Sequence, residues 1–590
     1  MSHLKHTITI LLCIVVITSL TACSQPIDNN SISSNATQTV SLTQVQQNFN
    51  TFLDNLFKES FTNSIDVHFK LKEPEKYDIQ LKPELGKLDY GSYQENLKNN
   101  QNLLNTLKEY AINNLTQEQQ LTYRILEDYL TTQQTNYDFY YYGNAIGYIS
   151  GLQANYPLIF SEYKFYTEQD IQDYIAVLEQ LGGYLSDVGQ YLKEQSARGL
   201  FGADFIADKA IEQIESITNG SNNLFILSFQ EKLNNFVGLD EAVKQQYVEQ
   251  NNTVIQNTVL PAFVQLSSTI TSLKGTGYEG GLCQIPEGKA YYEMLIKTNT
   301  GSSKSVDELF QVLEKRKQNL ILEVQQIALQ DLSIINKLEE FPYENRTSQE
   351  MMDILIEKSK NDYPTLDHID YQIKEVPNYL KDIFVSPAAY IIPPIDATVE
   401  NTIYVNYDSD NTRAFSTMAH EGYPGHLYQN NYFLSLNKHP ILSVMNYKGY
   451  TEGWATYTEL HSYEFDSTYQ GNSAVSRIAA LNYELNLLLC SYIDIAVNYY
   501  GWDLERMNTE LAKLALPEMP DLYEHVVAEP CNYLQYYIGY LEIEELRQIA
   551  QEQLGNQFTA KEFNQVLLET GPCSFKIMKE EVEQYIKNKQ

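Results

Sequence analysis

Apolar residues recur with the spacing of an amphipathic helix along most of this 590-residue chain. Between residues 169 and 195 they stand at positions 171, 174, 175, 177, 178, 181, 184, 185 and 188. This spacing of i, i+3, i+4 and i+7 places them on one face of a helix. Similar patterns occupy residues 46–60, 97–111, 240–273, 305–329, 472–500 and 541–553. We therefore expect a mainly α protein.

The interruptions of this pattern indicate where other structure lies. Residues 275–288 are rich in glycine, which is typical of a turn region. Several prolines occupy residues 377–394, and the alternating polar and apolar residues 402–407 predict a strand. No repeat of fixed period and no abrupt change of composition occurs within 46–590. We expect one large helical body with a small β element before residue 411.

The charge of the chain excludes some classes of function. Its 76 Asp and Glu residues outnumber 41 Lys and Arg residues, which gives a formal charge of −35. Binding to nucleic acid, or to an anionic membrane through charge, depends on clustered basic residues, so neither is expected. With 43% hydrophobic residues, the chain can build a large core.

The N-terminus is typical of a targeting segment. Lys5 and His6 precede an apolar run over residues 8–20, which ends in Leu-Thr-Ala before Cys23. The run is shorter than the roughly 20 residues that a membrane span needs. It is similar to a bacterial lipoprotein signal, in which the cysteine is lipidated. We expect a signal peptide (1–22), a lipidated Cys23 with a flexible tether (23–45), and a domain (46–590) that is extracytoplasmic and anchored to the membrane through lipid alone.

Four cysteines remain in the domain, at Cys283, Cys490, Cys531 and Cys573, and no two form a CxxC pair. Outside the cytoplasm they could form disulfides, whose connectivity cannot be read from the sequence. Free buried thiols are an equal alternative.

Candidate metal ligands follow the predicted strand. His420 and Glu421 open the string HEGYPGH, which ends at His426, and Glu452 opens the later string EGWATYTE. A hydrolytic zinc site needs three protein ligands, an open position for water and a nearby carboxylate that takes the proton of the water. His420 and His426 could supply two nitrogens, Glu452 the third ligand and Glu421 the base.

The spacing of the two histidines differs from that of the helical HExxH motif. Histidines four residues apart emerge on nearly the same face of a helix. His420 and His426 are six residues apart, so an unbroken helix would turn them about 120° away from each other. Pro424 and Gly425 favour a break that could bring both rings to one metal. The alternative is two ordinary histidines on either side of a proline-glycine turn.

These motifs give the chain a resemblance to a known family. The strings at 420–426 and 452–459, the earlier QIPEGKAYY at 284–292 and the stretch 529–547 resemble, in this order, the bacterial domain of unknown function 885 family. That family, often lipoproteins, resembles mainly α zinc oligopeptidases and has an HExxPGH variant of the zinc motif. The resemblance implies a large helical body with a central cleft and a zinc metallopeptidase that hydrolyses short peptides.

The resemblance also implies roles for individual residues. His420, His426 and Glu452 would bind Zn²⁺, and Glu421 would be the general base. Glu459 competes with Glu452 for the third ligand position, because residues seven apart share a helix face. We prefer Glu452, since Gly453 and Ala455 would leave space beside a metal, and Glu459 would then orient a ligand.

Two further residues are candidates for stabilising the transition state. Tyr536, in a YxxG string that matches the family, could donate a hydrogen bond to the tetrahedral oxyanion, and His525 is a second candidate. The alternative for Tyr536 is an ordinary core aromatic residue. The chain departs from the family pattern at Leu427 and Asn498, where histidine is common, and at His525-Val526, where an arginine-aromatic pair is common.

A rival interpretation is a lipoprotein that keeps the peptidase fold but serves as a binding or scaffold protein. A hydrolase of another type is disfavoured, because the chain has neither a GxSxG nor a GxxxxGK[ST] motif. The sequence leaves open the natural substrate, the choice between endopeptidase and carboxypeptidase action, and the oligomeric state.

Overall fold

Helices form most of the structure, as the apolar periodicity predicts. The computed structural model describes residues 41–61, 64–80, 82–135, 139–147, 151–219, 223–339, 346–381, 386–397, 400–406, 413–466 and 472–590. The predicted signal peptide (1–22), Cys23 and most of the predicted tether lie outside these residues. Helix α1 (Leu42–Phe61) begins inside the predicted tether, so residues 42–45 are helical. None of the described helices is long and apolar enough to cross a membrane.

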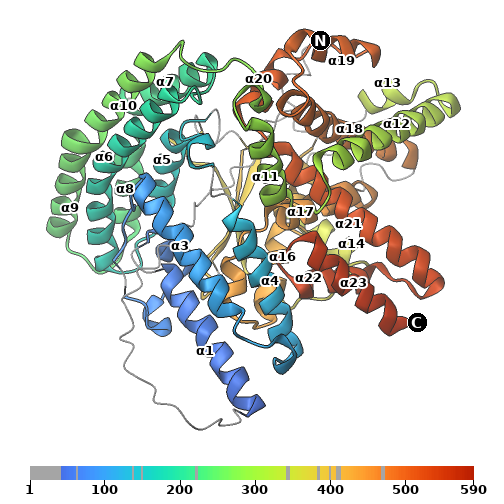
Figure 1. Ribbon diagram of the computed structural model, residues 1–590, viewed down its shortest axis with the longest axis horizontal. Helices are drawn as coiled ribbons and strands as arrows, with labels where there is room; N and C mark the ends of the chain where they lie inside the picture. The colour runs from blue at the N-terminus through green and yellow to red at the C-terminus, as the bar shows by residue number, and fades with distance from the viewer. Residues whose placement is uncertain are drawn as a thin grey trace.

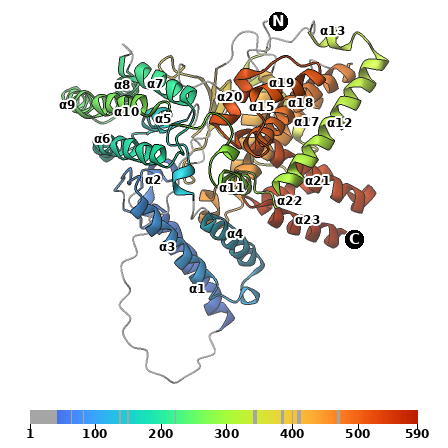
Figure 2. The ribbon, with the colours of Figure 1, turned by 45° about the horizontal axis from the view of Figure 1, so that its top comes forward.

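The first half of the chain builds two groups of helices. The first group contains α1, α2 (Asp66–Lys70), α3 (Tyr90–Leu107) and α4 (Gln117–Gln134). The second contains α5 (Leu152–Glu162), α6 (Glu168–Ala197), α7 (Asp204–Asn219), α8 (Leu224–Asn235), α9 (Glu241–Val254) and α10 (Leu260–Leu273). The second group has its own apolar core, in which Tyr174, Leu181 and Phe263 are buried. Figures 1 and 2 show α6 to α10 gathered on one side of the molecule.

Single residues explain where two of these predicted helices begin or divide. The Thr167 side chain accepts a hydrogen bond from the Asp170 backbone N–H and Asp170 bonds back, which is a capping box at the start of α6. The helix predicted over 240–273 is divided into α9 and α10 by a π-helical turn, Ile255–Val259. The spacing of apolar residues is nearly continuous across a π-helical turn, so the sequence alone did not indicate this division of the helix.

The second half of the chain contains the remaining helices and the larger core. They are α11 (Gly288–Thr300), α12 (Val306–Gln330), α13 (Ile334–Glu339), α14 (Ser348–Ser359), α15 (Ala414–Glu421), α16 (His426–Ser435), α17 (Lys448–Phe465), α18 (Ser473–Asn498), α19 (Leu504–Lys513), α20 (Pro520–Ala528), α21 (Asn532–Leu554), α22 (Ala560–Thr570) and α23 (Phe575–Lys589). Short 3₁₀ segments connect several elements, at 74–77, 112–114, 140–142, 282–284, 440–444 and 555–557.

A small sheet precedes α15, where the sequence predicts a β element. Its strands are β1 (Tyr371–Glu375), β2 (Ala388–Ile391) and β3 (Asn401–Val405), in the order β1-β3-β2. β1 is parallel to β3, and β2 is antiparallel to it, with Tyr390 opposite Ile403. Both residues pack against Met418 and Ala419 of α15 in a buried cluster, so the sheet fixes the position of that helix.

Helices α17 and α21 approach each other closely through glycine. A Cβ atom on Gly539 of α21 would collide with the backbone of Gly449 and Gly453 of α17. The lack of side chains at this crossing lets the two backbones touch, which brings the first turns of α21 beside the residues that α17 contributes to the site.

Candidate metal centre

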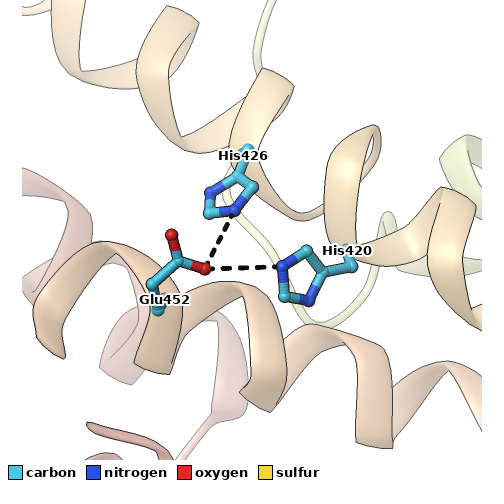
Figure 3. A group of neighbouring side chains, drawn as sticks. All are labelled: His420, His426 and Glu452. Carbon is cyan, nitrogen blue, oxygen red and sulfur yellow. Dashed lines mark ion pairs between the residues drawn. The ribbon is translucent and has the colours of Figure 1, made fainter. Parts of the chain in front are cut away.

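Three predicted metal ligands converge in the structure although they come from three helices. His420 lies in the last turn of α15, His426 begins α16 and Glu452 lies in the second turn of α17. Oε2 of Glu452 lies 3.6 Å from Nε2 of His420 and 3.4 Å from Nε2 of His426. Figure 3 shows both imidazole rings pointing toward this one carboxylate oxygen. One ligand atom from each residue lies within 4.8 Å of the others, and all three side chains are buried.

A break in the helix brings the two histidines together. Helix α15 ends at Glu421 and α16 begins at His426, and the Tyr423–Pro424 peptide bond between them is cis. Gly425 lies against the carbonyl oxygens of Ala419 and His420, where any Cβ would collide. The proline and glycine therefore have the role that the sequence suggests, and the two rings meet face to edge with centroids 4.8 Å apart.

The helix that carries Glu452 also holds this break in place. The indole Nε1–H of Trp454, two residues after Glu452, donates a hydrogen bond to the carbonyl oxygen of Pro424 at 2.9 Å. Trp454 is buried. The turn between the histidines and the helix of the third residue are thus fixed to each other by one interaction.

Glu459 contacts the opposite side of His420. Its Oε2 accepts hydrogen bonds from Nδ1 of His420 at 3.0 Å and from the Tyr483 hydroxyl at 2.8 Å. Its Oε1 accepts hydrogen bonds from Arg413 at 2.8 Å and from Ser416 at 3.2 Å. With its oxygens committed to these donors, Glu459 holds the His420 ring, and Glu452 is the carboxylate that faces both histidines.

The carboxylates of Glu452 and Glu459 stabilise a positive charge on the His420 ring. Burial alone would lower the pKa of His420, but Glu452 and Glu459 outweigh burial and raise it to about 10. Burial would raise the pKa of Glu452, but the two histidines hold it well below its usual range. A metal cation that replaces the imidazole proton would be stabilised by the same carboxylates.

Glu421 lies beside the ligands with one oxygen fixed and the other available. Its Oε2 accepts a hydrogen bond from the backbone N–H of Tyr390 in β2 at 2.8 Å. Its Oε1 is buried and has no hydrogen-bond partner among the described residues. Burial raises the pKa of Glu421, although both histidines oppose this. A carboxylate with a raised pKa is suited to accept a proton.

A narrow cavity of about 60 Å³ opens beside His420 and Glu421. Its wall includes Tyr536, whose ring centroid lies 6.3 Å from that of His420. His525, the second candidate from the sequence, is not among the residues that line the cavity. Its ring packs against Tyr533, which does line it, with centroids 4.8 Å apart. The structure therefore brings Tyr536 to the site and places His525 behind the wall.

Several sequence-based expectations need correction or reassignment. Gly453 does not leave space beside the ligands, because Gly539 of α21 fills that side of the helix. Leu427 is buried against the sheet, in the cluster of Met418 and Ile403. Asn498 bonds the backbone, accepting from the Leu282 N–H and donating to the Val526 carbonyl. All four cysteines of the domain are free thiols.

Sequence reasoning missed three residues of the site. Arg413 and Tyr483 bond Glu459, but nothing in their local sequence indicates this, because Arg413 directly precedes α15, Tyr483 lies in α18, and they meet only after folding. Tyr533 lines the cavity three residues before Tyr536. The i, i+3 spacing on a predicted helix could have indicated Tyr533, since such residues are neighbours on the helix surface.

The residues present fit a zinc ion. Two imidazole nitrogens and one carboxylate oxygen form a donor set of hydrolytic zinc sites, which keep a further position open. Nε2 of His420 is buried and has no hydrogen-bond partner among the described residues. The contact of Nδ1 with Glu459 leaves this Nε2 as the nitrogen that could bind the ion.

Comparisons with known proteins agree with the fold. The chain matches the family described as "Bacterial protein of unknown function (DUF885)" over residues 77–582, and it belongs to that family. A predicted lipoprotein from Colwellia psychrerythraea has a similar structure, with a TM-score of 0.79 and 20% identity over 93% of this chain and 100% of that one. A predicted lipoprotein of unknown function from Shewanella oneidensis has a TM-score of 0.59 and 16% identity over 92% and 99%. No curated protein matches the chain.

Proposed function

We propose that this protein is a zinc-dependent peptidase that hydrolyses short peptides and is held outside the cytoplasmic membrane by a lipid on Cys23. The convergence of His420, His426 and Glu452 beside Glu421 is the observation that supports it most directly. These four residues are the ligands and the base that metal-assisted hydrolysis requires.

His420, His426 and Glu452 would hold the zinc ion, which when bound lowers the pKa of a water molecule to about 7 and polarises a carbonyl group. Glu421 accepts the proton of the attacking water at Oε1, because the Tyr390 N–H occupies Oε2. Glu421 then gives this proton to the leaving amine. Tyr536 donates a hydrogen bond to the developing oxyanion from its place in the cavity wall.

The proposed location and substrate class follow from separate observations. The lipoprotein-like N-terminus and two similar structures described as predicted lipoproteins support an anchored, extracytoplasmic protein. A cavity of about 60 Å³ beside buried ligands favours short, unfolded peptides over folded proteins. The charge of −35 disfavours nucleic acid as a partner.

The test is zinc content and peptide cleavage by purified residues 24–590. We expect about one zinc ion per chain and cleavage of a mixture of short peptides. Glu421→Gln should keep the metal and lose turnover by a factor of 10² or more, since it removes the base. Glu518→Gln is the matched control, because it makes the same chemical change at an exposed position.

A binding or scaffold protein with the same fold is the alternative outcome. Stoichiometric zinc without cleavage of any peptide would favour that role. Loss of zinc on His426→Ala or Glu452→Ala is expected in either case, whereas tight zinc binding by both variants would refute the ligand assignment.

A further inference from the structure

Tyr533 stands at the candidate site but has no part in the chemistry described above. It lies in the first turn of α21, one turn before Tyr536. Both tyrosines line the cavity beside the candidate metal ligands, and so do His420 and Glu421. Because Tyr533 and Tyr536 line the same cavity one helical turn apart, a substrate bound there would lie near both side chains.

The Tyr533 hydroxyl is buried without a hydrogen-bond partner among the described residues. The residue is only 7% exposed. The Cys490 thiol lies beside this hydroxyl and interacts with it, but a thiol is a weak acceptor that satisfies a hydroxyl poorly. Burying a hydroxyl in this way destabilises a protein, and native structures seldom retain such groups without a reason.

The chemistry of the wall limits what the hydroxyl can bind. Burial raises the pKa of Tyr533, so its phenol stays protonated and can act as a donor. The cavity has room for roughly four to six water molecules, since one water needs about 10–15 Å³ of such space. The Arg413 charge at the wall is already bound to Glu459. The Tyr533 phenol therefore suits an uncharged hydrogen-bond acceptor.

We propose that the Tyr533 hydroxyl donates a hydrogen bond to a main-chain carbonyl oxygen of the bound peptide, beside the bond that is cleaved. A main-chain carbonyl is small, uncharged and present in every peptide. Tyr536 serves the carbonyl that is attacked, and Tyr533 holds the next one, so the pair fixes the direction of the peptide across the site. This inference rests on the proposed peptidase function.

Tyr533→Phe tests the inference because it removes only the hydroxyl. Since that hydroxyl has no stronger hydrogen-bond partner than a thiol among the described residues, the melting temperature should stay the same or rise. The kcat/KM for tetra-alanine should fall about 3- to 10-fold, the effect of one hydrogen bond. Binding of tetra-alanine to zinc-loaded Glu421→Gln protein, measured by calorimetry, should weaken by a similar factor when Tyr533→Phe is added.

Tyr174→Phe is the matched control. The Tyr174 hydroxyl in α6 is also buried without a hydrogen-bond partner among the described residues, but Tyr174 belongs to the other core and does not line the cavity. We expect the same effect on melting temperature as for Tyr533→Phe, and unchanged cleavage and binding.

Two results would overturn the inference about Tyr533. One is cleavage and binding by Tyr533→Phe equal to the parent, and the other is a clear fall in its melting temperature relative to Tyr174→Phe. Both presuppose that the parent cleaves tetra-alanine. A parent that binds zinc and cleaves no peptide of any length contradicts the peptidase function itself, so the two failures are distinguishable.

Discussion

Nδ1 of His420 lies 3.0 Å from Oε2 of Glu459, and both residues are buried. This contact turns Nδ1 toward Glu459 and leaves Nε2 directed at Glu452. Arg413 and Tyr483 hold Glu459 in turn. The orientation of one candidate ligand therefore depends on a chain of contacts that reaches from α15 to α18.

Removing the charge of Glu459 should weaken metal binding without abolishing it. In Glu459→Gln, we expect zinc affinity to fall about 10- to 100-fold, as is typical when the partner of a ligating histidine is lost. Chelator competition measures this. Glu452→Gln should lower the affinity more, because it removes a ligand. If Glu459→Gln had the larger effect, the roles of the two carboxylates would be reversed.

Gly425→Ala should disturb the turn between the histidines. Its Cβ would collide with the carbonyl oxygens of Ala419 and His420, so we expect a lower melting temperature and weaker zinc binding. Gly183→Ala in α6 is the control, because its Cβ would meet nothing within 4 Å. That variant should be about 0.5–1 kcal/mol more stable, since alanine favours a helix interior. Equal melting temperatures and equal zinc affinities of the two variants would contradict a tight turn at Gly425.

Trp454→Phe should affect both stability and the metal site. It leaves the Pro424 carbonyl without its donor, which costs about 1–3 kcal/mol for a buried group, in addition to lost packing. We expect a lower melting temperature and zinc affinity reduced several-fold. Trp502→Phe changes a buried tryptophan between α18 and α19, and it should lower stability through packing alone and leave zinc affinity unchanged. Unchanged zinc affinity in Trp454→Phe would show that the indole hydrogen bond to Pro424 does not support the metal site.

Asp494 should make stability depend on pH. Burial raises its pKa from 3.8 to about 7, against hydrogen bonds from Tyr292, Asn498 and the Cys531 backbone. The folded state therefore holds the proton more tightly than the unfolded state. The contribution of this group is present below pH 4 and is lost as the pH rises from about 4 to about 7.

The difference in melting temperature between the parent and Asp494→Asn isolates this effect. Asparagine does not titrate, so the parent should lose stability relative to the variant between pH 4 and pH 7, and the difference should be constant above that range. Parallel curves for the two proteins across this range would show that Asp494 does not titrate there.

Much of the fold follows from local patterns in the sequence. The helix predicted over 305–329 is α12 (Val306–Gln330), and that over 472–500 is α18 (Ser473–Asn498). The strand predicted over 402–407 is β3, whereas β1 and β2 were not predicted individually. Strands this short have too few residues to show a period, and their pairing with β3 joins segments that are distant in the chain.

The sequence by itself determined the helical class, the residue types of the candidate site and the break at Pro424 and Gly425. These depend on local spacing and on backbone properties of single residues. Only the tertiary structure decided that Glu452 faces both histidines while Glu459 supports one, because residues seven apart share a helix face and periodicity cannot separate them. The tertiary structure also decided the roles of Gly453, Arg413 and Tyr533, because these roles depend on which parts of the chain pack against them.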